Sequence, residues 1–390
     1  MALKVVNTES LDAVANAINS KSGRSGALQF PEGFVEAVEG ISAGGGGENY
    51  LAQFAEGAIT ELNPTHLAGC TAIGDYAFYY NRTIKNVMLP NSVISIGVYA
   101  FSNAYIESIT LSENVKTIGS RAFSSSNLLS LYFPDSIEQI GESAVSYCSQ
   151  LTNVRLPNNS KVVYDAQAIY NNDSLESLDI PCGAIRNNAF ADNSYLKTLT
   201  IGEGVTQIGY GAFYQNTRLE TVYYNAISVP DITGTTSGSG TFRYVGDATE
   251  NGCTVYIGKN VKRIPNFLFG LRTSSQSHNI TSIVFSNDSE CEEIAQGAFN
   301  NCAKLKNVNI PKSITRLDTY FSSCKALEYI DLTAYGADGA FPVLTSSNRF
   351  DGCGTSTTAG TFEIRVPTGR KAELSAMTNW STYADNIVEV

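Results

Sequence analysis

The hexapeptide Ile73-Gly74-Asp75-Tyr76-Ala77-Phe78 decides the fold of this chain, because the chain repeats it at a nearly constant interval. It returns as Ile96-Gly97-Val98-Tyr99-Ala100-Phe101 and as Ile118-Gly119-Ser120-Arg121-Ala122-Phe123. Its last, apolar position then recurs at steps of 21 to 24 residues as far as Phe213. A fixed period of this length indicates a solenoid, in which each unit packs against its neighbours.

A second motif precedes the hexapeptides and predicts a short strand. It alternates apolar and polar residues and often ends in proline, as in Leu151-Thr152-Asn153-Val154-Arg155-Leu156-Pro157. This alternation is typical of a half-buried strand, which proline ends because it has no N–H to donate. A further alternation, such as Val115-Lys116-Thr117-Ile118, precedes a glycine that allows either positive φ or close backbone approach. The sequence therefore predicts a mainly β solenoid of about 22- to 23-residue units, each with two short strands and turns.

These motifs resemble the BspA-like class of leucine-rich repeats, whose consensus runs roughly L-x-x-I-x-I-P-x-x-V-x-x-I-G-x-x-A-F-x-x-C. The resemblance covers about residues 60–390. It implies a solenoid over 60–365 and a C-terminal cap over 366–390, which contains the single tryptophan, Trp380. Members of this class are commonly surface or binding proteins, and the repeat carries no catalytic residues. The resemblance therefore implies a binding function.

Four of the eight cysteines share one position of the repeat with four asparagines, three residues after the phenylalanine position. Leucine-rich repeats characteristically alternate Asn and Cys where a small buried side chain hydrogen-bonds the backbone of the turn. These thiols are therefore expected to be packed and reduced. No Cys-x-x-Cys pair occurs and the two histidines are not paired with cysteines, which argues against redox chemistry or a metal site. The residues at this position are Asn81, Ala104, Ser126, Cys148, Asn172, Asn193, Asn216, Arg272, Cys302, Cys324 and Cys353.

The period fails twice, and both gaps predict insertions. Phe213 and Phe269 are 56 residues apart, and Phe269 and Phe299 are 30 residues apart. We expect insertions near 226–250 and 270–280, where Gly, Ser and Thr are frequent. Long loops on a rigid scaffold often bind ligands, although a tolerated insertion leaves the same pattern. The candidate binding residues in the first insertion are Arg243 and Tyr244.

Residues 1–43 predict a different, helical module. Apolar residues recur at helical spacing within 11–18 and again within 34–41. Two short helices bury little core alone, so the module is expected to dock on another protein or to pack back on the solenoid as a cap. The glycine-rich linker at 44–59, which leads into the first repeat, favours docking. The residues expected to form the docking face are Leu11, Val14, Ile18, Phe30, Phe34, Val38 and Ile41.

This module is similar to a segment that recurs in structural proteins of tailed bacteriophages. The shared pattern is roughly L-x-x-I-A-x-A-I-R-x-K-T-G-x-x-x-x-L-x-F-P-x-G-F-x-x-x-I-x-x-I, matched here between Leu11 and Ile41. The resemblance implies a virion protein of the tail fibre, tail tip or head, attached to other virion proteins through residues 1–43. In such proteins the segment usually lies beside a variable, often ligand-binding domain.

Composition argues against several classes of function. Of the 390 residues, 26 are Lys or Arg and 37 are Asp or Glu, and the net charge of −11 argues against nucleic acid or an anionic membrane as partner. No apolar run approaches the roughly 18 residues that predict a membrane span. Gly-x-Ser-x-Gly, a Walker loop and His-Glu-x-x-His do not occur, so we expect no enzyme activity, no cofactor and no metal.

The polar position inside each first strand is expected to face outward and to supply the ligand-binding surface. Mixed Tyr, Arg, Asp and Thr suit a glycan or a protein through stacking and hydrogen bonds, although an ordinary solvated sheet face shows the same alternation. The candidate residues on this face are Tyr132, Arg155, Asp179, Tyr223 and Tyr329.

These features together predict a non-enzymatic bacteriophage virion structural protein. Polar residues after Val6 interrupt the apolar run that a secretory signal needs, so synthesis in the host bacterial cytoplasm is expected. The solenoid would face outward on the virion surface, on tail or capsid, and would bind a host-surface glycan or protein. By analogy, the chain would form a homo-oligomer, such as a trimer. The alternatives are a bacterial cell-surface BspA-like adhesin and a carbohydrate-active enzyme that uses the 226–250 loop.

Overall fold

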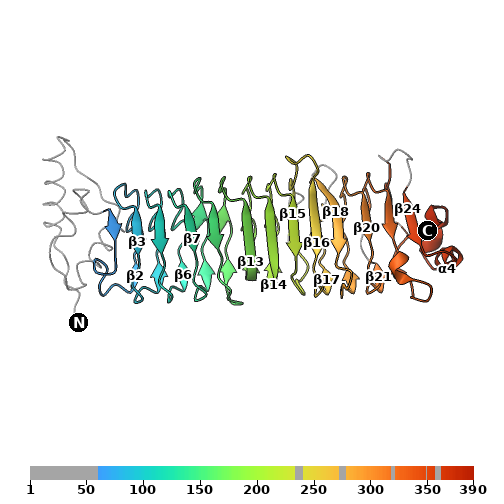
Figure 1. Cartoon of the computed structure of the whole chain (residues 1–390), viewed down its shortest axis with the longest axis horizontal. Helices are drawn as coiled ribbons and strands as arrows, with labels where there is room; N and C mark the ends of the chain where they lie inside the picture. Colours follow the sequence, from blue (N-terminus) through green and yellow to red (C-terminus); the bar gives the residue numbers. More distant parts are fainter. Residues whose placement is uncertain (1–59, 233–239, 272–277, 318–320, 348, 356–361) are drawn as a thin grey trace. The chain divides into compact units, whose positions relative to one another are not determined.

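The computed structural model describes residues 60–232, 240–271, 278–317, 321–347, 349–355 and 362–390. The helical module expected at 1–43, with its docking face from Leu11 to Ile41, lies outside these residues. The chain divides into two compact units, the first ending at Asn159 and the second beginning at Ser160. Each unit is a β-solenoid of short strands that pair in parallel between successive coils (Figure 1). The β-solenoid predicted from the repeat is therefore confirmed within each unit.

The unit that ends at Asn159 contains coils with two short strands each. Its strands are β1 (Glu61–Leu62), β2 (Ala72–Ile73), β3 (Asn86–Met88), β4 (Ser95–Ile96), β5 (Ser108–Thr110), β6 (Thr117–Ile118), β7 (Ser130–Tyr132), β8 (Gln139–Ile140), β9 (Val145–Ser146) and β10 (Asn153–Arg155). The first strands pair as β1-β3-β5 and β7-β10, and the second strands pair as β2-β4-β6-β8. The pairing aligns equivalent repeat positions, so that Ile73, Ile96 and Ile118 lie side by side.

The unit that begins at Ser160 continues the same construction with longer strands. Its strands are β11 (Val163–Tyr164), β12 (Ile169–Tyr170), β13 (Ser177–Ile185), β14 (Thr198–Ile208), β15 (Thr221–Tyr224), β16 (Cys253–Ile257), β17 (Arg263–Ile264), β18 (Ile280–Phe285), β19 (Glu293–Ile294), β20 (Asn307–Asn309), β21 (Arg316–Leu317), β22 (Tyr329–Asp331), β23 (Val343–Leu344), β24 (Glu363–Val366) and β25 (Ile387–Glu389). One sheet runs β11-β13-β14-β15-β16-β18-β20-β22-β24-β25, and a second runs β17-β19-β21-β23.

The core of each unit is a stack of the phenylalanines that set the repeat. In the first unit the ring centroids of Phe78 and Phe101 are 5.0 Å apart. In the second unit the stack runs from Phe190 to Phe362 with neighbouring centroids 4.9 to 6.1 Å apart. These separations are those of favourable aromatic pairs, which stabilise a core beyond their buried area.

The glycine that follows the isoleucine is required by close backbone approach. A Cβ on Gly97 would lie 2.6 Å from the Asp75 nitrogen, and a Cβ on Gly119 would lie 2.7 Å from the Gly97 oxygen. Positive φ occurs instead two residues later, at Tyr99 and Arg121, each with a φ of 54°. The side chain is therefore excluded at this position because neighbouring coils touch there.

Residues 240–250, which the sequence predicts as part of an insertion, form a coil of the second unit together with strand β16 that follows them. Phe242 lies in the phenylalanine stack, with its ring centroid 4.9 Å from that of Phe213 and 5.1 Å from that of Phe269. Strand β16 then pairs with β15 on one side and β18 on the other. The 56-residue gap thus contains a further phenylalanine of the repeat.

The last coil is covered by the α-helix α4 (Lys371–Ala376) and the 3₁₀ helix η2 (Trp380–Asn386). Trp380 is fully buried, and its Nε1 donates a hydrogen bond to the Pro342 carbonyl at 2.9 Å. The indole centroid lies 6.0 Å from the ring of Phe350, the next-to-last phenylalanine of the stack. The cap therefore keeps the end of the aromatic core from water.

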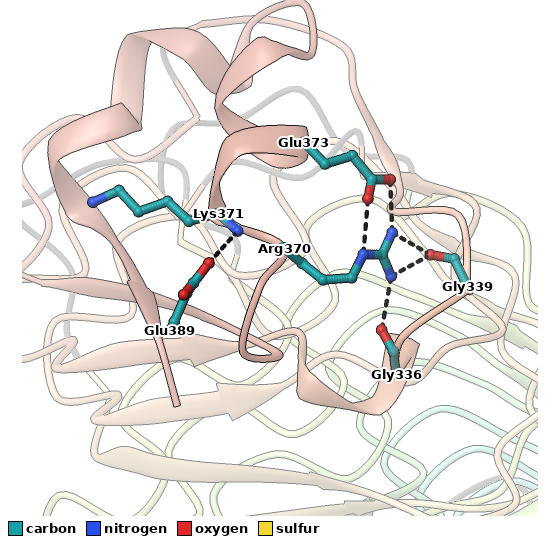
Figure 2. A network of polar contacts seen from close by, with 6 residues as sticks. All are labelled: Gly336, Gly339, Arg370, Lys371, Glu373 and Glu389. Carbon is teal, nitrogen blue, oxygen red and sulfur yellow. Dashed lines mark hydrogen bonds and ion pairs between the residues drawn. The ribbon is translucent and has the colours of Figure 1, made fainter.

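A buried arginine attaches this cap to the preceding turn, which contains the 3₁₀ helix η1 (Thr333–Tyr335). The Arg370 guanidinium forms a two-pronged ion pair with Glu373 and donates to the carbonyls of Gly336 and Gly339 at 2.7 to 2.9 Å (Figure 2). The backbone N–H of Lys371 donates to Glu389, on the last strand, at 2.8 Å. These contacts satisfy the buried guanidinium, which would otherwise be costly.

The asparagines and cysteines of the shared repeat position hydrogen-bond the turn backbone, as the sequence predicts. The Asn193 Nδ2 donates to the Ile169 and Phe190 carbonyls at 2.9 and 3.0 Å, and its Oδ1 accepts from the Asn172 N–H at 3.0 Å. In the same position, the Sγ of Cys353 donates to the Phe321 carbonyl at 3.0 Å. The Asn193 side chain thus joins three backbone groups, whereas the Cys353 thiol donates to one carbonyl.

We expect Asn193→Ala to lower the free energy of unfolding by about 2 to 4 kcal/mol, because it leaves buried backbone groups unsatisfied. Asn193→Cys should cost less, since a thiol serves this position in other coils. Urea denaturation followed by circular dichroism measures both. The exposed Asn260→Ala is the matched control and should change stability by less than about 0.5 kcal/mol. Equal stability of the alanine variant and the wild type would contradict the structural role of this side chain.

Candidate ligand-binding surface

The outward face of the main sheet in the second unit is built from in-register rows of side chains. In strands β13 to β18 the buried positions alternate with positions that face solvent. Parallel pairing places equivalent residues of successive coils side by side, about 4.8 Å apart. One outward row reads Asp179, Thr200, Tyr223, Tyr256 and Val284.

The centre of this row is a pair of stacked tyrosines on β15 and β16. The ring centroids of Tyr223 and Tyr256 are 5.4 Å apart with an interplanar angle of 20°. The two residues remain 43% and 41% exposed, and Val284 beside them is 40% exposed. Three neighbouring strands therefore present a continuous apolar and aromatic strip to solvent. Such side chains combine an apolar face with a polar hydroxyl, which suits a ligand that is itself amphipathic.

A row of hydroxyl side chains runs beside the tyrosines, two residues earlier on each strand. These positions also face outward, and they are aligned by the same parallel pairing. Each hydroxyl is both a donor and an acceptor of hydrogen bonds, and the row repeats it at the strand spacing. The residues of the row are Ser177, Thr198, Thr221, Thr254 and Ser282. We call these residues, together with Tyr223 and Tyr256, the tyrosine–hydroxyl surface.

The strand-face candidates predicted from the sequence include Tyr223 but not Tyr256. The alternation Cys253-Thr254-Val255-Tyr256-Ile257 is nevertheless a strand pattern. An insertion predicted over 226–250 implies no strand directly after it, which is why Tyr256 is absent from the predicted face. Of the other candidates, Asp179 lies in the same outward row, at the β13 end.

Two further candidates of the strand face, Arg155 and Tyr132, lie side by side, and the guanidinium of Arg155 is already engaged. In the first unit Arg155 pairs in register with Tyr132. Its guanidinium is held by the Phe133 carbonyl at 2.7 Å and by Asp135 at 2.8 Å. Tyr132 itself is 52% exposed. Both residues thus lie together on the outward face of β7 and β10.

In the second unit Tyr329 is covered by a cation. The guanidinium carbon of Arg365 lies 3.6 Å from the Tyr329 ring centroid, and the Arg365 Nε pairs with Glu363 at 2.9 Å. This geometry is a cation–π contact that stabilises the arginine over the ring. Arg365 belongs to the outward row as the neighbour of Asp331.

Arg243 and Tyr244 form a separate cluster in the turn after Phe242. The Arg243 Nη2 donates to the Tyr244 hydroxyl at 2.7 Å, and its guanidinium carbon lies 4.5 Å from the Tyr244 ring centroid. Tyr214, from the preceding coil, joins them with its ring centroid 5.8 Å from that of Tyr244. Arg243 and Tyr244 therefore form a site separate from the predicted binding residues on the outward strand face.

The repeat itself matches a known family. The BspA type leucine rich repeat region, in six copies, matches residues 71–183, 165–236 and 235–337. The chain belongs to this family. The family assignment agrees with the repeat motifs and with the paired coils of the BspA-type solenoid.

Solved leucine-rich repeat structures resemble this BspA-type chain at low identity. A leucine-rich repeat protein from Bacteroides ovatus is 17% identical with a TM-score of 0.44, covering 85% of this chain and 84% of that one. A leucine rich cell surface protein from Faecalibacterium prausnitzii is 19% identical, with a TM-score of 0.28, covering 70% and 87%. The pneumococcal vaccine antigen PcpA is 15% identical, with a TM-score of 0.31, covering 82% and 83%. No curated protein matches the sequence significantly.

The cysteines of this BspA-type protein are packed as free, buried thiols. Burial raises the pKa of Cys148 to about 11 and the pKa values of Cys253 and Cys291 to about 12. Thiolates are the reactive and metal-binding form, so these side chains are inert near neutral pH. Within the described ranges, no group of three His, Cys, Asp or Glu residues is arranged to hold a metal ion. No helix of these ranges is long and apolar enough to cross a bilayer.

We expect at most about one of the eight thiols to react with a disulfide reagent within minutes at pH 8 in the native protein, because all eight are buried away from the reagent. All eight should react after unfolding in guanidinium chloride. Absorbance titration of the released thiolate measures both numbers, and the unfolded sample is the control. Rapid reaction of several native thiols would contradict the packed arrangement.

Proposed function

We propose that this BspA-type protein is a non-enzymatic recognition protein that holds a glycan or protein ligand on its outward strand face. The tyrosine–hydroxyl surface carries the proposal. The exposed parts of the stacked tyrosines, together with Val284 beside them, offer apolar area, and the adjacent hydroxyls offer donors and acceptors at a regular spacing. A sugar ring has an apolar face and a rim of hydroxyls, so a glycan matches both features. Binding of this kind requires no covalent chemistry and no cofactor.

The regular spacing favours an extended ligand over a compact one. Adjacent strands repeat the same side-chain type every 4.8 Å or so, so one ligand can contact Thr221, Thr254 and Ser282 in succession. Each contact is individually modest, because an exposed hydrogen bond exchanges with water. Affinity would then come from several contacts along the row and from the tyrosine pair at its centre.

Replacement of both Tyr223 and Tyr256 by alanine should weaken ligand binding by about tenfold or more, since it removes the aromatic centre of the surface. A glycan array containing bacterial-surface and mucin-type glycans selects the probe, and isothermal calorimetry measures its affinity. Tyr195→Ala is the matched control, because Tyr195 is 39% exposed and stands outside the outward strand rows. Unchanged affinity in the double variant would place the ligand elsewhere.

We further propose that the solenoid is displayed on a bacteriophage particle. The support is the resemblance of residues 1–43 to the recurrent segment of tailed-phage structural proteins. In this arrangement residues 1–43 bind other virion proteins, on tail or capsid, and the chain assembles as a homo-oligomer such as a trimer. The solenoid faces the host surface. A bacterial cell-surface adhesin is the competing proposal for the same recognition surface.

Deletion of residues 1–43 should leave a folded solenoid that is absent from phage particles, because the docking face is removed. Mass spectrometry of gradient-purified particles measures incorporation, and the full-length chain is the control. Circular dichroism tests the fold of the deletion variant. Normal incorporation of this variant would refute attachment through residues 1–43. Recovery of the full-length chain in the cell envelope rather than in particles would favour the adhesin.

A further inference from the structure

A polar pocket of about 370 Å³ lies beside the second sheet of the unit that begins at Ser160. Three neighbouring strands supply its wall, because Arg263 on β17, Glu293 on β19 and Arg316 on β21 pair in register. Arg349 also lines it and is only 7% exposed. The lining therefore gathers three guanidinium groups in a chain whose net charge is −11.

One part of the pocket is an ion-paired wall. The Arg263 Nη1 lies 2.7 Å from the Asp231 carboxylate, and its Nε lies 3.0 Å from the Glu293 carboxylate. Burial alone would raise the pKa of Asp231, but hydrogen bonds from Arg263 and from the Asn266 N–H outweigh it and lower that pKa. Both carboxylates are thus ion-paired with Arg263. Their negative charges repel a ligand that carries more than one negative charge.

The lining as a whole suits a ligand with one negative charge and several hydroxyls. Among the described lining residues, three arginines (Arg263, Arg316 and Arg349) face two carboxylates (Asp231 and Glu293). The Asn266 Oδ1 is buried and accepts no hydrogen bond from the described residues. Gln296, exposed at the rim, adds an amide with both donors and an acceptor. A guanidinium fork matches a carboxylate in shape and charge.

We propose that this pocket binds an acidic sugar residue, with its carboxylate at Arg316 and Arg349 and its hydroxyls at Asn266 and Gln296. The volume is in the range of small-ligand pockets and fits one or two sugar rings. A monoanion is favoured over inorganic phosphate or sulfate because Asp231 and Glu293 stand close by. The pocket is lined by side chains outside the tyrosine–hydroxyl surface, so this inference does not depend on the strand face binding a glycan.

The test is calorimetric titration of the full-length protein with galacturonic acid and with glucuronic acid, each of which carries a single carboxylate. Glucose is the neutral control, and sodium phosphate and sodium sulfate are the anion controls at matched ionic strength. We expect both uronates to bind and glucose not to bind. Arg316→Gln should weaken uronate binding by about tenfold or more, because it removes a charge-assisted contact. Arg186→Gln, at an exposed arginine outside the pocket, is the matched control and should bind like the wild type.

Gln296→Ala provides a second variant at an exposed side chain, and it decides the outcome if Arg316→Gln does not fold. It should weaken binding several-fold. Failure of both uronates to bind, or binding that neither variant weakens, would overturn the proposal. Phosphate or sulfate binding as tightly as the uronates would indicate a general anion site and would also overturn it. Loss of uronate binding on replacement of Tyr223 and Tyr256, but not of Arg316, would move the sugar to the strand face.

Discussion

The whole arrangement depends on parallel, in-register pairing of one coil with the next. In-register pairing places each residue against its own counterpart in the neighbouring coil, so each position of the repeat becomes a row. A row is stable only if its side chain tolerates a copy of itself at about 4.8 Å. Phenylalanine meets this condition by stacking, as Phe299 does on Phe321. Asparagine meets it by joining its own coil to the preceding one: Asn193 donates to the Phe190 and Ile169 carbonyls and accepts from the Asn172 N–H.

The same constraint acts on the surface, where charges of one sign would repel in a row. Adjacent coils instead alternate sign: Lys85 pairs with Glu107 at 2.7 Å and Lys197 with Glu176 at 3.0 Å. Exposed pairs of this kind contribute little stability each, up to about 1 kcal/mol. Like charges directly opposite each other on neighbouring coils would instead destabilise the pairing. The outward rows that remain uncharged, such as Thr198 to Ser282, are then available for ligands.

Sequence periodicity was sufficient to predict the interior but not the whole surface. The phenylalanine and asparagine rows were predictable because both depend on spacing along the chain alone. The outward position of Tyr256 was not predicted, because the coils between Phe213 and Phe269 differ in length from the period and the repeat unit of Phe242 is not apparent from spacing. The pocket was not predictable, since Asp231 and Arg349 are brought together only by the lengths of the coils between them. The sequence explains the glycine after the isoleucine either by positive φ or by close backbone approach. A Cβ on Gly119 would lie 2.7 Å from the Gly97 oxygen, so close backbone approach is the reason.

Departures from the period account for the buried charges of the solenoid. Among the described residues, the arginines that are buried are Arg349 and Arg370, both in the part of the chain that follows the last regular coils. A regular coil presents the same small set of backbone groups at each turn and has no room for a guanidinium. A lengthened turn adds carbonyls, such as those of Gly336 and Gly339, that can satisfy one. Regular coils thus yield flat, repetitive surfaces suited to extended ligands, whereas the concave polar pocket forms where Arg349, from a lengthened coil, meets the in-register row of Arg263, Glu293 and Arg316.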